Sequence, residues 1–209
     1  MIVDLLFSVI GESVPTDHAY ALYAALSRSV PAFHQVDTRV RFAPLTGMAG
    51  EPGHLRLTDR SHLRVRLPAD AIRTVLSLAG RSLDVAGANI RLGPPSVVPL
   101  VPAPSVVAYL VTFKHGEEVD HFLVTAKAKL KELGVTGDPT VPVISTNAKS
   151  KRAGETRRRI VRIKDAAIVG YSLVVSGLSA DDSIRLQEHG LGGRTRMGCG
   201  FFLPTEDTK

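Results

Sequence analysis

Residues 61–91 read SHLRVRLPADAIRTVLSLAGRSLDVAGANIR, and their pattern indicates the fold class. Its first seven residues alternate between polar and apolar side chains, which predicts a half-buried strand. A helix then begins at Pro68, because proline is favoured in the first helical turn, and it ends at Gly80. Residues 82–91 return as a pair of strands. A strand, a helix and a returning strand are typical of the second half of a ferredoxin-like domain.

The preceding residues supply the first half of the same domain. A helix is expected after an N-cap at Thr16 or Asp17, and Pro31 ends it. Three strands are expected around this helix, and they cover residues 1–11, 37–45 and 53–58. Together with residues 61–91 they follow the β-α-β-β-α-β pattern, with one extra strand between the helices and a pair of strands at the end. Residues 1–93 are therefore predicted to form one ferredoxin-like domain.

A similar order restarts after a proline-rich stretch. Residues 94–104 hold Pro94, Pro95, Pro99, Pro102 and Pro104, which predicts a stiff linker. The later strands are expected at 106–113, 141–145, 157–163, 168–175 and 201–203, and the helices at 117–133 and 179–189. We therefore expect an α+β protein of two tandem ferredoxin-like (RRM-like) domains, the second over residues 105–209 with a C-terminal glycine-rich loop.

The composition limits the kinds of function. The chain has 209 residues, a net charge of +6, 44% hydrophobic residues and 5% aromatic residues. A basic balance favours a polyanionic partner, whereas few aromatic residues leave few platforms for base stacking. Cys199 is the single cysteine, so no internal disulfide or cysteine zinc site is expected. We find no signal peptide or membrane-spanning run and expect a cytoplasmic protein.

The positive charge is concentrated in one segment. Residues 147–164 contain eight basic residues and one acidic residue, Glu155. Gly154 is expected at the tip of a hairpin, whose strand would lie along RNA and contact phosphates. The alternative is a solvated loop, which is what a run of charge usually forms. The RNA-binding candidates in this segment are Lys149, Lys151, Arg152, Arg157, Arg158, Arg159 and Arg162.

Residues 190–200 read GLGGRTRMGCG and form the most specific motif. Two Gly-apolar-Gly units flank five residues, and glycine lets the backbone turn sharply and approach another molecule closely. Arg194 and Arg196 between them are candidates to bind phosphates, together with Gly192 and Gly193. The segment follows a helix and opens a strand, so it is neither a Walker A loop nor a dinucleotide-binding loop.

This loop resembles the signature loop of the CRISPR repeat-processing endoribonucleases of the repeat-associated mysterious protein (RAMP) superfamily. The motif from Leu186 to Arg194, followed by Met197 to Phe202, carries the resemblance, which extends over the whole chain through the paired ferredoxin-like halves. The resemblance implies a hydrolase of antiviral defence that binds the CRISPR repeat RNA, often a stem-loop, and cleaves the precursor transcript. It implies no metal or other cofactor. The 2′-hydroxyl would attack the adjacent phosphate and leave a 2′,3′-cyclic phosphate.

A histidine commonly assists this chemistry in the family. We choose His34, because it follows the break at Pro31 and matches the place where the family often carries its catalytic histidine. His18 competes, since the helix N-terminus would lower its pKa. Tyr20 is the preferred assisting residue, whereas Tyr23 has the spacing of a core residue. The family often places a lysine beside the histidine, but no lysine precedes Lys114 in this chain. The positive charge that stabilises the transition state would then come from Arg28, Arg39, Arg41 or a residue of the other domain.

Two other functions stay open. The chain could be a non-catalytic RNA-binding subunit of a CRISPR effector complex, or a general ferredoxin-like RNA-binding protein. The latter lacks the expected aromatic stacking motif. The sequence shows no carboxylate cluster with metal-ligand spacing. It leaves open the repeat sequence, the CRISPR subtype, homodimer formation and association with other effector subunits.

Overall fold

The computed structural model describes residues 1–34, 39–144, 154–164 and 166–205. The chain divides into two compact units, each with its own core. The first unit comprises Met1–Leu100 and also Arg196–Gly198, and the second comprises Val101–Thr195 and Cys199–Lys209. Three residues of the glycine-rich segment therefore belong to the first unit.

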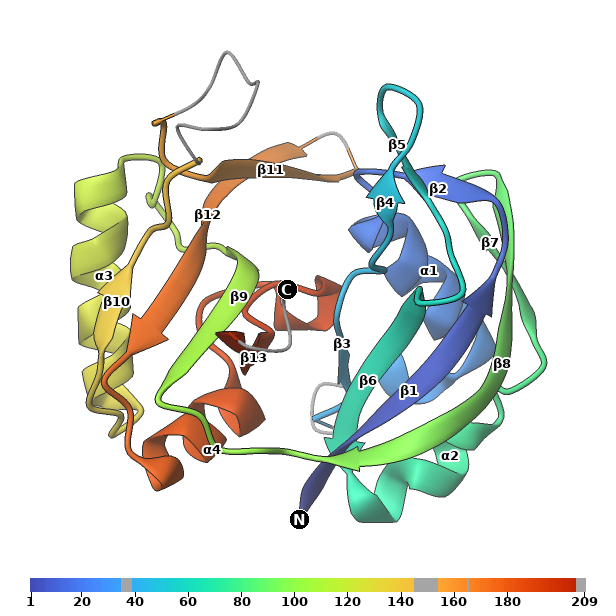
Figure 1. Cartoon of the computed structure of the whole chain (residues 1–209), viewed down its shortest axis with the longest axis horizontal. Coiled ribbons are helices and arrows are strands. Elements are labelled where there is room, and N and C mark those ends of the chain that lie inside the picture. Colours follow the sequence, from blue (N-terminus) through green and yellow to red (C-terminus); the bar gives the residue numbers. More distant parts are fainter. Residues whose placement is uncertain (35–38, 145–153, 165, 206–209) are drawn as a thin grey trace. The chain divides into compact units, whose positions relative to one another are not determined.

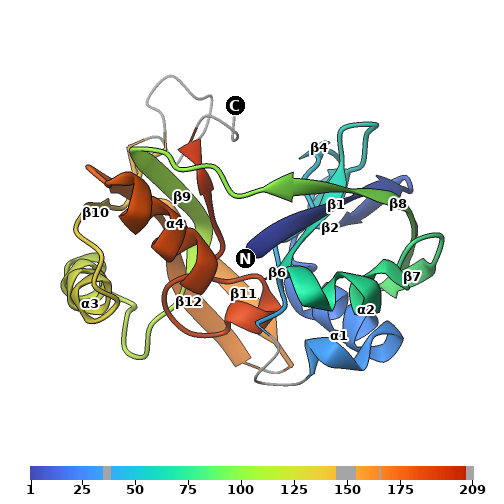
Figure 2. The same ribbon diagram turned by 90° about the horizontal axis from the view of Figure 1, so that it is seen from below.

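The first unit is an antiparallel sheet with helices on one face (Figures 1 and 2). Its strands lie in the order β3 (Arg41–Phe42), β6 (His62–Pro68), β1 (Ile2–Ile10), β8 (Ala88–Pro99) and β7 (Ser82–Val85). The helices are α1 (Ala19–Ser29) and α2 (Ile72–Leu76), with 3-10 turns η1 (Pro31–Phe33) and η3 (Ala69–Ala71). A small second sheet joins β2 (Ser13–Pro15), β5 (His54–Arg56) and β4 (Met48–Ala49).

Alternation along β1 explains how this sheet packs. Val3, Leu5 and Phe7 are buried in the core of the first unit, as a strand with one apolar face requires. Asp4 points to the other face and is also buried, where it accepts bonds from Arg66 at 2.8 Å and Arg64 at 3.0 Å on β6. A buried carboxylate needs such partners, because desolvating an unpaired charge is costly.

The second unit repeats the plan. Its sheet has the order β10 (Asp138–Thr140), β12 (Ala166–Ser176), β9 (Ser105–Val111) and β13 (Phe202–Pro204), and β11 (Arg158–Ile163) also pairs with β12. The helices α3 (Val119–Glu132) and α4 (Ala180–His189) pack against its core (Figure 2). Ser179 caps α4 by accepting a bond from the Asp182 N–H, at the start of the helix expected over 179–189.

Both sheets share the ferredoxin-like strand order, in which the first strand lies between the third and the fourth. This confirms the predicted fold class. Several details of the predicted secondary structure were wrong. Residues 94–99 continue β8 instead of forming a linker. Of the strand expected at 141–145, the described residues 141–144 hold only an isolated bridge from Val143 to Thr156, and β10 takes the place beside β12. His18, without a side-chain cap bond, occupies the N-cap of α1 that was assigned to Thr16 or Asp17.

Candidate active site and nucleic-acid interface

His34 lies at the surface of the first unit, directly after α1 and η1. Pro31 begins η1, and the His34 N–H donates to the Pro31 carbonyl at 2.8 Å. Phe33 is buried against Phe42, with ring centroids 6.4 Å apart, whereas His34 is exposed. The buried phenylalanine therefore anchors the turn and leaves the imidazole accessible, as acid–base chemistry requires.

Tyr23 on α1 is the tyrosine that meets His34. Its hydroxyl lies 3.3 Å from Nδ1 of His34, and the two rings meet edge-to-face with centroids 5.6 Å apart. This bond holds the ring by one nitrogen, so that Nε2 is the nitrogen available for proton transfer. Tyr20, the residue preferred from the sequence, packs against Tyr23, with ring centroids 6.5 Å apart. Tyr23 was assigned to packing because its spacing along the helix is typical of a core residue. A buried ring can still present its hydroxyl at the surface.

His18 has a different role from the one considered in the sequence. Its Nδ1 lies 2.8 Å from the Pro15 carbonyl, and its Nε2 accepts a bond of 2.8 Å from the Leu45 N–H. Both ring nitrogens are thus engaged in the interior, which requires the neutral form with the proton on Nδ1. Burial lowers the pKa of His18, whereas we had expected the helix N-terminus to do so. His18 joins the start of α1 to the segment before β4 and is a structural residue.

Arg196 supplies a cation next to His34. It lies on the 3-10 turn η4 (Thr195–Met197), and its Nη1 donates to the His34 carbonyl at 2.8 Å. Met197 packs on the core of the first unit, and an added Cβ at Gly198 would lie 3.0 Å from Pro44. The glycine-rich segment therefore delivers a guanidinium to the candidate catalytic histidine, with further N–H donors beyond the one used here.

The other arginines considered for this role are placed differently. Arg28 is exposed in the last turn of α1, and Arg39 is exposed with a left-handed φ of 51°. Arg41 lies on β3 opposite Arg66, and burial lowers its pKa. Among the described residues, neither Arg28 nor Arg39 has a hydrogen bond to His34.

The exposed part of the glycine-rich segment lies in the second unit, at the end of β9. The Gly193 N–H donates to the Thr112 carbonyl at 2.8 Å, and the Thr112 hydroxyl donates to the Gly193 carbonyl at 3.2 Å. Gly192 has a φ of +86°, and an added Cβ would lie 2.7 Å from the Thr112 oxygen. Glycine is therefore needed at 192 for packing within the protein. Gly192, Gly193 and Arg194 are exposed and remain candidates for RNA contact.

The basic segment is described only in part. Lys149, Lys151 and Arg152 lie outside the described residues. In β11, exposed and less exposed residues alternate along the strand. Arg157, Arg158 and Arg162 are exposed, whereas Arg159 is partly covered. The described basic side chains that are expected to bind RNA are thus accessible, and Arg159 is less exposed than the others.

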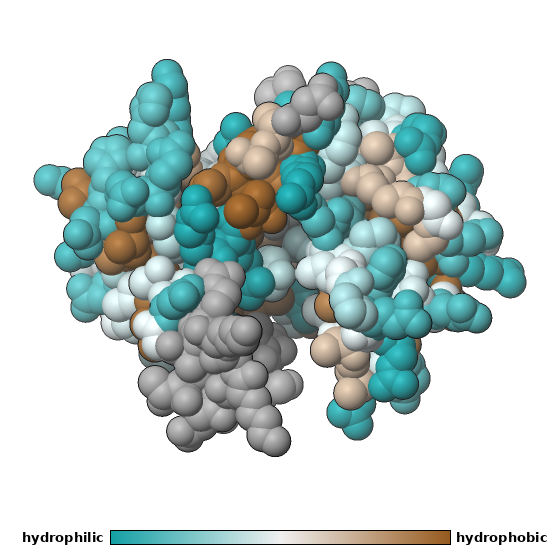
Figure 3. Space-filling model, turned by 90° about the horizontal axis from the view of Figure 1, so that it is seen from above, coloured by the Kyte–Doolittle hydropathy of each residue, from teal (hydrophilic) through white to brown (hydrophobic). Residues whose placement is uncertain are grey.

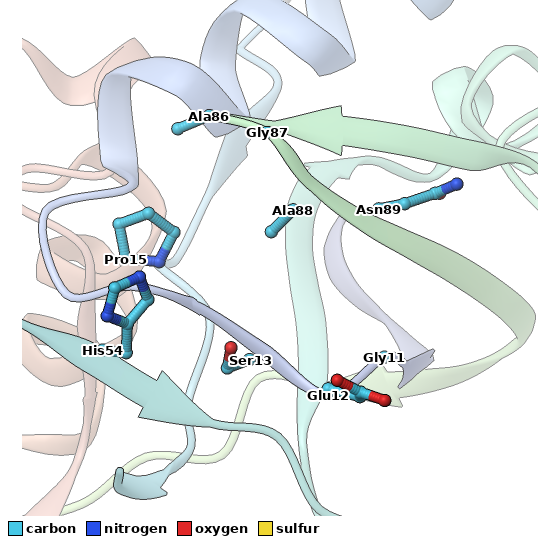
Figure 4. Close-up of a pocket in the computed structure, with 9 residues that line it drawn as sticks. All are labelled: Gly11, Glu12, Ser13, Pro15, His54, Ala86, Gly87, Ala88 and Asn89. Carbon is cyan, nitrogen blue, oxygen red and sulfur yellow. The ribbon is translucent and has the colours of Figure 1, made fainter. Parts of the chain in front are cut away.

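Further features of the described chain also bear on its function. An open pocket in the first unit holds Glu12 and His54, but Figure 4 shows their side chains at opposite ends. Among the described residues, no cluster of three or more His, Cys, Asp or Glu side chains could hold a metal ion. No helix there combines the length and apolarity of a membrane span, and hydrophilic residues cover most of the face in Figure 3.

A family model described as "Cas6: Cas6 Crispr" matches residues 3–207. The chain belongs to the Cas6 family. A CRISPR-associated endonuclease Cas6 of Myxococcus xanthus (strain DK1622) is 44% identical over 202 residues, which are 97% of this chain and 81% of that protein. This identifies the chain as a member of the RAMP endoribonuclease group that the glycine-rich motif resembles.

Solved structures agree with the Cas6 fold. A Cas6-related protein from Pyrococcus furiosus superposes with a TM-score of 0.68 at 12% identity, covering 99% of this chain and 100% of its own. A RAMP protein that binds different RNA substrates superposes with a TM-score of 0.67 at 12% identity, covering 97% of this chain and 98% of its own. At these identities the likeness shows the fold alone.

Proposed function

We propose that this Cas6-family protein is an endoribonuclease that binds CRISPR repeat RNA, as a stem-loop, and cuts the precursor transcript into guide RNAs. The observation that carries the proposal is the exposed His34, held by the Tyr23 hydroxyl at 3.3 Å and by Arg196 at 2.8 Å. The relative from Myxococcus xanthus, a CRISPR-associated endonuclease, supports it.

The proposed reaction uses the substrate's own ribose. The 2′-oxygen attacks the adjacent phosphorus as the bond from phosphorus to the 5′-oxygen breaks. The products are a 2′,3′-cyclic phosphate and a 5′-hydroxyl, and no metal ion takes part. A neutral His34 can take the proton of the 2′-hydroxyl, or an imidazolium can give a proton to the leaving 5′-oxygen. The Tyr23 hydroxyl fixes the ring in either form, because Nδ1 carries a proton in both and the hydroxyl oxygen can accept it while Nε2 reacts.

Arg196 is proposed to stabilise the charge that develops on the phosphate oxygens. Its guanidinium keeps its charge at neutral pH and presents several donors in a fixed plane. The bond to the His34 carbonyl holds it beside the histidine, so little reorganisation is needed during the reaction. This gives the chain a cation in place of the family's lysine.

The proposed RNA contacts away from the reaction are those of the exposed glycine-rich residues and the basic segment. Gly192, Gly193 and Arg194 present backbone and a guanidinium at the surface. Arg157, Arg158 and Arg162 are exposed on and beside β11, and they are proposed to bind phosphates. Lys149, Lys151 and Arg152 are proposed to extend this surface.

The test is incubation of the protein with its cognate repeat RNA in EDTA, followed by analysis of the RNA ends. We expect cleavage to persist and to leave a cyclic phosphate. His34→Ala should slow single-turnover cleavage by about 10²–10⁴-fold while RNA binding is retained. His54→Ala, which removes an exposed histidine of the same unit, is the matched control and should cut normally.

Three results would count against the proposal. A requirement for magnesium would exclude the metal-independent mechanism. An unchanged rate in His34→Ala, with no other histidine substitution slowing the reaction, would exclude histidine catalysis. Wild-type protein that binds the repeat but never cuts it would instead indicate a non-catalytic RNA-binding subunit.

A further inference from the structure

Tyr109 is exposed in the middle of the second sheet. It lies on β9, which pairs with β12 on one side and β13 on the other. Val106 and Ala108 of the same strand are buried in the core beneath the helices, so the alternation of the strand turns Tyr109 to the opposite face. About half of this side chain, 49%, is exposed. An exposed aromatic ring at the centre of a sheet is unusual in a chain with so few aromatic residues.

Arg159 of β11 lies over this ring. Its guanidinium carbon is 3.6 Å from the centre of the Tyr109 ring, and its Nη1 donates to the Tyr109 hydroxyl at 2.6 Å. Its Nε donates to the Ser172 hydroxyl at 3.0 Å, and that hydroxyl donates to the Tyr109 carbonyl at 2.7 Å. Three strands thus fix the two side chains, which we call the Tyr109–Arg159 pair, in one geometry.

The pair carries a positive charge in a partly desolvated place. The described partners of the Arg159 guanidinium are hydroxyl groups, which do not neutralise it. Burial and the neighbouring Arg157 lower the pKa of Arg159, whereas Tyr109 raises it. Arg157 and Arg158 next to it are exposed. The surroundings therefore favour an anionic ligand.

We propose that the Tyr109–Arg159 pair is a stacking site for one unpaired base of the RNA. A base has a flat π-face that stacks on aromatic rings and on guanidinium planes, while its phosphate is attracted by the nearby arginines. A phosphate alone would gain nothing from the exposed ring. The identity of the ligand as RNA rests on the proposed function, but the site shares no residue with Tyr23, His34 or Arg196.

The experiment places 2-aminopurine at successive positions of repeat RNA that carries a 2′-deoxy sugar at the cut, so that binding is seen without cleavage. Stacking on the wild-type protein should quench the fluorescence at one unpaired position. Tyr109→Ala should abolish this quenching and weaken RNA binding by about fivefold or more. Tyr109→Phe keeps the ring and should retain most of the quenching.

Two further variants separate stacking from other effects. Arg159→Lys keeps the charge but removes the plane, so it should also lose the quenching. Val124→Ala removes an exposed apolar side chain from α3 and should bind like wild type. If Arg159→Lys binds normally and quenching persists in Tyr109→Ala, the stacking site is refuted. Circular dichroism and melting of each variant would show whether it is folded.

The outcomes also distinguish this site from the cleavage proposal. If the wild-type protein cuts unmodified RNA and the 2-aminopurine fluorescence is the same with wild type and Tyr109→Ala, only the stacking site is refuted. Quenching that depends on Tyr109 in a protein that never cuts would refute only the nuclease. If repeat RNA does not bind, short single-stranded RNAs with 2-aminopurine test the pair directly, and unquenched fluorescence there refutes it.

Discussion

His18→Ala offers a test of the structural role of the buried imidazole. The wild-type ring joins the Pro15 carbonyl to the Leu45 N–H, and it lies in the interior beside α1. Alanine removes both bonds and leaves the Leu45 N–H buried without its acceptor. No proton transfer is involved, so the expected effect is on folding.

The magnitude follows from the two bonds. A buried donor that loses its partner costs about 1–3 kcal/mol, and the bond to Pro15 is worth about 1 kcal/mol net. We expect the free energy of unfolding to fall by about 2–4 kcal/mol at pH 8. His18→Gln can offer an oxygen to the Leu45 N–H and should recover part of this loss.

The pH dependence gives a second signature. The pKa of His18 is lowered from 6.5 in the folded protein. Above pH 6.5 the ring is neutral in both the folded and the unfolded state, and the two hydrogen bonds of His18 stabilise the wild type fully. As the pH falls below 6.5, the unfolded state binds a proton that the folded state does not, so wild-type stability declines by at most about 1.4 kcal/mol per pH unit. Alanine cannot titrate, so the difference in free energy of unfolding between wild type and His18→Ala should become smaller as the pH falls.

Urea unfolding at pH 8 and pH 5.5, followed by circular dichroism, measures both effects. His54→Ala serves as the control, because this histidine is exposed and should change stability by no more than about 0.5 kcal/mol. The reasoning is refuted if His18→Ala matches this control at pH 8, or if its deficit is the same at both pH values.

Two other substitutions, one in each unit, are tested by urea unfolding. Asp4→Ala leaves Arg66 buried without its carboxylate and should cost about 3–5 kcal/mol, whereas adding Arg66→Met should restore much of it. An undiminished loss in the double variant would contradict this. Gly192→Ala should cost about 1–3 kcal/mol, because of its positive φ and the Thr112 oxygen 2.7 Å away. Gly193→Ala, whose nearest neighbour is 3.7 Å away, should be tolerated, and equal losses at both positions would refute the steric explanation.

The sequence predicted the periodic elements well and the irregular ones poorly. The alternating strand at 61–67 and the capped helix after Ser179 follow from local rules and are present. The prolines of 94–99 were misread as a linker. Residues 94–99 form half of β8, and Val3 to Phe7 of β1 pair with this half of the strand. The sheet therefore overrides the local preference of the prolines.

The candidate site was only partly predictable for a similar reason. His34 was chosen because it follows a clear helix end, and the structure shows only that it is exposed. Its neighbours depend on contacts that local spacing does not encode. Tyr23 lies eleven residues earlier on a buried helix face, and Arg196 is 162 residues away in the chain. Tyr109 was missed because a single aromatic residue in an apolar strand has no distinguishing pattern.

The membership of Arg196–Gly198 in the first unit bears on how the gene can be divided. A polypeptide ending at Leu100 would keep Tyr23 and His34 but lack the guanidinium that bonds to the histidine carbonyl. The complementary fragment would hold that arginine without its target. Split-protein reporters that separate the chain at this boundary would therefore complete the proposed active centre only after the two fragments reassemble.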